Sequence, residues 1–91
     1  MVWRMISKLE WTFGDRLRKI RRSMNLSSRE FAARVGVTHS ALSQYETDRM
    51  QPRDVVAFAR RVEDVSGVPA AWLLGLSDDV PEVRDVVLVA A

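Results

Sequence analysis

The stretch SSREFAARVGVTHSALSQYE, residues 27–46, contains two short helical patterns joined by a glycine. Apolar residues recur at helical spacing on both sides of Gly36, and Ser27 and Thr38 are residue types that commonly cap helix N-termini. Glycine tolerates the left-handed conformation in which many helices end. Because only Val37 separates Gly36 from Thr38, the two predicted helices must cross at a steep angle.

The flanking sequence predicts three further helices. The one before this stretch has Thr12 as its cap and an apolar face of Phe13, Leu17, Ile20 and Met24. After a loop over residues 47–51, Pro52 is expected in the first turn of a helix whose buried side is Val55, Val56, Phe58, Ala59 and Val62. Pro69 is expected to open the last helix, which holds Trp72, Leu73 and Leu76. The predicted fold is therefore all-α, with five helices between residues 12 and 76.

The two ends are predicted separately from this domain. Residues 1–11 fit either a helix or an extended arm, and the tail, residues 77–91, includes a run of β-branched residues that indicates a strand. A lone strand leaves its backbone N–H and C=O groups unpaired. The strand therefore needs a partner, either residues 1–6 of the same chain or the same segment of a second chain.

Composition excludes several classes of function. Among the 91 residues there is no cysteine and only one histidine, so neither a disulfide nor a typical zinc site is expected. No apolar run approaches the ~18 residues that a membrane span requires, and the start does not resemble a signal peptide. The chain is expected to act in the cytoplasm without a cofactor.

The net charge is +2, but the charged residues are unevenly distributed along the chain. Residues 1–34 carry nine Lys or Arg against three acidic residues, whereas residues 62–91 carry one Arg against six acidic residues. A basic half suggests a polyanionic partner, although on charge alone a solvated helix face is the more ordinary explanation.

The predicted helix over residues 38–46 has an outer face suited to reading DNA. Its outward residues are polar and essentially uncharged: Thr38, His39, Ser40, Ser43 and Gln44. A merely solvated face more often carries Lys, Glu and Arg, whereas a helix with hydrogen-bonding side chains fits the major groove. Catalysis by His39 would need an oriented partner and a cleft, and a residue near the start of a convex helix has neither.

Residues 13–76 resemble the helix-turn-helix domain of the lambda-repressor/Cro family, also called the Xre-like regulators. The matching residues are FGDRLRKIRRSMNLSSREFAARVGVTHSALSQYE, followed by Asp48, Arg49 and Pro52 at the family's spacing. The resemblance implies that the five outward residues face the major groove, with Gln44 suited to adenine and His39 to guanine. It also implies that Arg21 and Glu46 form a structural pair.

The resemblance further implies phosphate contacts at the start of the second helix and in the loop before the fourth. The residues expected there are Ser28, Arg49, Met50 through its backbone N–H, and Arg53, with Arg16 and Arg29 for flanking phosphates. The sequence departs from the family at Ser28, where glutamine is common, and at Asp48, where glycine is usual. We expect the Asp48 charge to repel the DNA backbone and to weaken the binding of this loop to phosphate.

The function implied by the resemblance is a sequence-specific transcriptional regulator of the phage repressor or Cro type, in a bacterium or the bacterial host of a phage. The expected partner is double-stranded operator DNA with a pseudo-palindromic sequence. A homodimer is expected to form through the tail residues Val83, Val86, Val87, Leu88 and Val89. The alternatives are an antitoxin of a toxin–antitoxin pair and a protein-interaction module that keeps the fold. Nothing in the residues supports an enzyme.

Overall fold

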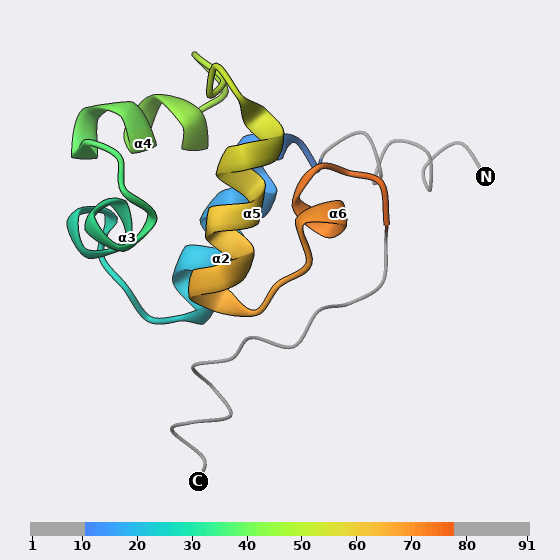
Figure 1. The fold of residues 1–91 in the computed structure, drawn as a ribbon. Coiled ribbons are helices and arrows are strands. Elements are labelled where there is room, and N and C mark those ends of the chain that lie inside the picture. The colour runs from blue at the N-terminus through green and yellow to red at the C-terminus, as the bar shows by residue number, and fades with distance from the viewer. Residues whose placement is uncertain (1–10, 78–91) are drawn as a thin grey trace, which may run out of the picture.

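The computed structural model describes residues 11–77, which form five helices. These are α2 (Phe13–Ser23), α3 (Ser28–Val35), α4 (His39–Glu46), α5 (Val55–Ser66) and α6 (Ala70–Leu73) (Figure 1). The predicted all-α helix-turn-helix fold is confirmed for this part of the chain. The N-terminal arm or helix, except Trp11, and the predicted strand over residues 83–89 lie outside the described residues.

Helices α2 and α3 both begin with a capping box, in which cap and third residue exchange hydrogen bonds. Thr12 accepts from the Asp15 N–H at 3.1 Å while the Asp15 carboxylate accepts from the Thr12 N–H at 3.2 Å. Ser27 and Glu30 make the same exchange at 3.1 and 2.9 Å. The hydrogen bond from the backbone of each cap residue lowers the pKa of Asp15 and Glu30 below their ordinary values.

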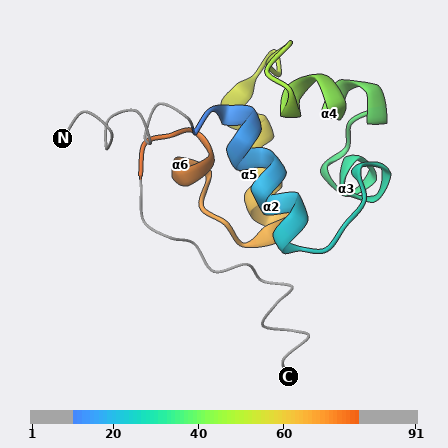
Figure 2. The same cartoon turned by 180° about the vertical axis from the view of Figure 1, so that it is seen from behind.

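In Figures 1 and 2, α2 and α5 lie one behind the other in the centre of the view, with α6 on one side of them and the α3–α4 pair on the other. Their shared core is a continuous cluster of apolar side chains, among them Leu17, Phe31, Leu42, Phe58 and Val62. Tyr45 and Phe58 meet edge to face with their ring centroids 5.4 Å apart, which packs α4 against α5. The core thus holds α4 through one face and leaves the other free.

Three predictions about the second half of the domain are wrong. Helix α5 begins at Val55 and not at Pro52, because the Asp54 side chain accepts from the Ala57 N–H at 3.0 Å and caps the helix. Val56 is 47% exposed, on the side of α5 away from the buried Phe58. Leu76 is 78% exposed, because α6 ends at Leu73 and the chain turns at Gly75 with a positive φ of 79°.

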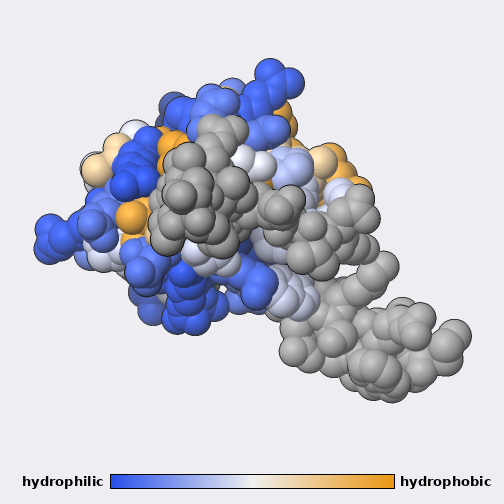
Figure 3. All heavy atoms as spheres, turned by 90° about the horizontal axis from the view of Figure 1, so that it is seen from below, coloured by the Kyte–Doolittle hydropathy of each residue, from blue (hydrophilic) through white to orange (hydrophobic). Residues whose placement is uncertain are grey.

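Seen from below, the described surface is largely hydrophilic, with hydrophobic residues in small patches between charged ones (Figure 3). Within residues 11–77 no helix has the length and apolar character needed to cross a lipid bilayer.

Candidate nucleic-acid interface

The turn between α3 and α4 sets the direction of α4. Gly36 adopts the left-handed conformation, with φ 78° and ψ 32°, and the Val37 N–H donates to the Ala32 carbonyl at 3.0 Å. Thr38 then caps α4 by accepting from the Ala41 N–H at 3.0 Å. In Figure 1, α3 is seen nearly end-on while α4 lies across the view, so the two axes cross steeply as predicted.

Helix α4 has two distinct faces. Leu42 and Glu46 are buried against the rest of the domain. His39, Ser40 and Ser43 are exposed, and Gln44 is half-buried beside them. Thr38 is also exposed, and its hydroxyl can still donate although its oxygen caps the helix. The structure therefore brings the five residues expected to read bases onto one convex surface, which we call the α4 face.

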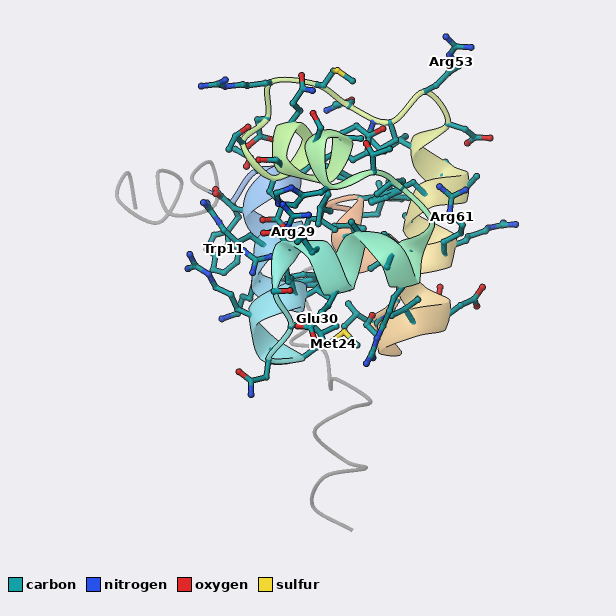
Figure 4. The ribbon with its side chains drawn as sticks, turned by 90° about the vertical axis from the view of Figure 1, so that its left-hand side faces the viewer. Trp11, Met24, Arg29, Glu30, Arg53 and Arg61 are labelled. Carbon is teal, nitrogen blue, oxygen red and sulfur yellow. The ribbon has the colours of Figure 1, made fainter. Side chains whose placement is uncertain are left out.

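Basic side chains lie on both sides of the α4 face. Arg29 is exposed in the first turn of α3, next to the half-buried Ser28, and Arg49 and Arg53 are exposed in the loop over residues 47–54. Figure 4 shows Arg53 pointing away from this loop into solvent, and Arg29 near the start of α3. A polyanion lying along the α4 face would meet positive charge at each side.

One residue expected at a phosphate, Arg16, is buried, and the backbone N–H expected to contact phosphate at Met50 already has a partner within the protein. Arg16 lies in the interior, where its guanidinium donates to the carbonyls of Trp72 at 2.9 Å and Ser77 at 3.3 Å, and stacks 4.8 Å from the Trp72 ring centre. The Trp72 ring and the carbonyls of Trp72 and Ser77 stabilise this buried cation, which the sequence pattern predicted on the outer surface of the helix. The backbone N–H of Met50 donates to the Gln44 carbonyl at 3.3 Å and is therefore already engaged within the protein.

The pair implied between α2 and α4 is present. Arg21 donates to the Glu46 carboxylate through Nε at 2.8 Å and through a terminal nitrogen at 3.1 Å, and its other terminal nitrogen donates to the Leu26 carbonyl at 3.1 Å. The two side chains are only 15% and 7% exposed. This bidentate pair fixes the C-terminal turn of α4 on α2.

The surface of α2 carries a shallow hollow that was not predicted from the sequence. It is lined by Trp11, Asp15, Arg18, Lys19, Arg22 and Ser23. The Lys19 ammonium lies 5.5 Å from the Trp11 ring centre, and Trp11 meets Trp72 edge to face. Residues 11, 15, 18 and 22 follow the three- and four-residue spacing of one helical face, so the sequence could have indicated that these side chains lie together. This hollow is separate from the α4 face.

The described residues include no cluster of three or more His, Cys, Asp or Glu side chains that could hold a metal ion. The exposed His39 at the start of α4 is accordingly not part of such a cluster. Its position on a convex surface makes it accessible to a partner molecule.

Comparison with family models matches residues 17–73 to a family described as helix-turn-helix. The chain belongs to the Xre/lambda-repressor-like helix-turn-helix family. The match extends from α2 to α6 and includes the whole α3–α4 unit. Comparisons with curated proteins and with solved structures give no match. Membership in this family makes the chain a DNA-binding transcription regulator of the Xre type.

Proposed function

We propose that this Xre-type regulator is a repressor of the phage repressor or Cro kind, which reads operator DNA by placing α4 in the major groove. The observation that supports this most directly is the α4 face, a convex surface of exposed or half-buried side chains that can hydrogen-bond but carry almost no charge. In the major groove each base pair presents a distinct pattern of donors and acceptors. Gln44 is suited to a bidentate contact with adenine, and His39 to donation to guanine N7 or O6.

The phosphate contacts in this proposal come from Ser28, Arg29, Arg49 and Arg53, which lie on the two sides of the α4 face. Such contacts fix the register of the protein on the duplex but carry no base information. They supply the salt-dependent part of the affinity, whereas the uncharged α4 face supplies the discrimination between sequences.

The regulator is proposed to act as a homodimer on a pseudo-palindromic site. One domain of this size makes few phosphate contacts, and two copies bound one helical turn apart raise both affinity and selectivity. The segment Val83–Val89, outside the described residues, is the proposed pairing strand, because a strand needs a second strand to satisfy its backbone. Deletion of residues 80–91 is expected to halve the mass in analytical ultracentrifugation, and an unchanged mass would remove this part of the proposal.

The test is selection of duplexes from a random-sequence pool at moderate salt. The wild-type protein is expected to enrich a palindrome. In the double variant His39→Ala/Gln44→Ala, the ratio of the affinity for that site to the affinity for a scrambled duplex is expected to fall about ten-fold. Arg60→Ala is the matched control, because Arg60 is exposed on α5 and the α4 face is unchanged.

The other outcomes separate the alternatives. Enrichment of one asymmetric site would keep α4 as the reading element but contradict the dimer. Weak binding that disappears as salt rises, with no enriched sequence, would contradict sequence-specific recognition and favour the interaction module. That result would also contradict the antitoxin interpretation, because an antitoxin of this kind is expected to bind an operator through the same domain.

A further inference from the structure

Asp48 lies at the point where α4 gives way to the loop that carries Arg49 and Arg53. It has a positive φ of 61°, and its N–H donates to the Tyr45 carbonyl at 3.2 Å. The next N–H, that of Arg49, donates to the Gln44 carbonyl at 3.0 Å. These two hydrogen bonds close the end of α4 as a Schellman motif with Asp48 in the left-handed position. The conformation of Asp48 therefore sets the direction in which the loop leaves α4.

The Asp48 carboxylate is bound by the start of α2. One oxygen accepts from the Thr12 hydroxyl at 2.6 Å, and the other accepts from the Gly14 N–H at 3.0 Å. The first N–H groups of a helix have no partner within the helix, and a negative charge is favourable there. Asp48 thus serves as a second cap of α2, supplied by the residue that follows the end of α4.

Gly14 makes this contact possible. A Cβ atom at position 14 would lie 2.7 Å from an Asp48 carboxylate oxygen and 2.6 Å from the Glu46 carbonyl oxygen. The absence of a side chain lets α2 approach the end of α4 closely enough for the two hydrogen bonds. The carboxylate is consequently directed toward α2, a helix of the core.

We propose that Asp48 is a positioning residue for DNA binding: by anchoring the start of the loop over residues 47–54 to α2, it holds Arg49 and Arg53 where they meet phosphate. This inference rests on the proposed function. It reverses the sign of the effect expected from charge alone, under which the Asp48 carboxylate repels the DNA backbone and weakens binding. The two effects are separable, because one depends on the hydrogen bonds and the other on the charge.

Two substitutions at this position separate them. Asp48→Asn removes the charge but keeps both links, because the amide oxygen can accept from the Gly14 N–H and the amide nitrogen can donate to the Thr12 hydroxyl. Asp48→Gly removes the charge and both hydrogen bonds to the start of α2, while glycine adopts the left-handed backbone conformation without strain. Both variants lose the same charge, so any difference between them reports on the anchor.

The experiment measures the Kd of the full chain for the duplex selected with the wild-type protein, by fluorescence anisotropy at one fixed salt concentration. Circular dichroism first establishes a temperature at which every variant is folded. Asp48→Asn is expected to bind as tightly as wild type or more tightly. Asp48→Gly is expected to bind roughly ten-fold more weakly, the scale of one lost charge-assisted hydrogen bond. Hydrogen exchange at the Gly14 amide is expected to accelerate in Asp48→Gly alone.

Glu63→Ala is the control for loss of stability. Glu63, near the end of α5, also accepts a backbone N–H at the start of another helix, that of Ala70 in α6 at 3.1 Å. Helix α6 and α4 lie on opposite sides of the domain in Figure 1. Its removal is expected to leave the Kd unchanged at the chosen temperature. If Asp48→Gly binds as tightly as Asp48→Asn, or if Glu63→Ala weakens binding equally, the anchor has no role. If the wild-type protein selects no duplex, it is the proposed function itself that fails.

Discussion

At the scale of the residue, Gly14 is expected to be required for stability although it sits inside a helix. Alanine normally stabilises a helix by up to ~1 kcal/mol relative to glycine. Here a Cβ would lie 2.6 and 2.7 Å from the carbonyl oxygens of Glu46 and Tyr45, which are backbone atoms with little room to move. We expect Gly14→Ala to lower the free energy of unfolding by about 1–3 kcal/mol, as overpacking does.

Urea unfolding followed by circular dichroism measures this effect. Ser23→Ala is the control, because Ser23 is the exposed last residue of the same helix and its substitution should be neutral or slightly stabilising. A Gly14→Ala variant more stable than wild type would show that α2 and the end of α4 do not approach as closely as described.

Residue roles that depend on distant partners could not be predicted from the sequence. Asp48 and Gly14 are 34 positions apart, and Arg16 and Trp72 are 56 apart. Nothing local distinguishes a carboxylate that caps a distant helix from one that repels DNA, or a buried arginine from an exposed one. By contrast, the left-handed conformation of Gly36 follows from its neighbours alone, because a helix ends there and the N-cap of the next helix follows two residues later.

At the scale of the element, the Arg21–Glu46 pair is expected to dominate the attachment of α4 to α2. Removal of one partner of a buried ion pair leaves an uncompensated charge, so Glu46→Ala should lower the free energy of unfolding by about 3 kcal/mol. Arg18→Ala, which breaks the Asp15–Arg18 pair at 2.9 Å, should cost less than ~0.5 kcal/mol, because those side chains are 37% and 32% exposed and solvent screens the pair.

Thermal and urea unfolding of both variants measure this contrast. The double variant Arg21→Met/Glu46→Leu should recover most of the loss, since apolar side chains of similar volume often replace a buried pair without cost. Equal effects of Glu46→Ala and Arg18→Ala would contradict the structural role assigned to the buried pair.

Element boundaries were predictable where a cap and a helical pattern agree, as at Thr12, Ser27 and Thr38. The start of α5 was missed because Pro52 is an acceptable first-turn residue, whereas the hydrogen bond from Ala57 to Asp54 decides the boundary three residues later. The orientation of α4, and with it the α4 face, followed from the two-residue spacing between Gly36 and Thr38.

At the scale of the whole molecule, the domain presents two different surfaces. The α4 face is uncharged and is flanked by Arg29, Arg49 and Arg53, whereas the hollow on α2 combines Trp11 with basic side chains. Charge alone would draw DNA to either surface, since both carry arginines. Only the α4 face combines flanking charge with a row of uncharged hydrogen-bonding groups, which base-specific recognition requires.

The most direct test of DNA binding through the α4 face is a titration of the ¹⁵N-labelled chain with its selected duplex, followed by the backbone amide chemical shifts in NMR spectra. If DNA binds at the α4 face, the largest changes will fall on Thr38–Gln44 and on the loop over residues 47–54, and α5 beyond Ala59 will be nearly unchanged. Changes confined to the hollow residues of α2, with the α4 face unaffected, would contradict this mode of binding.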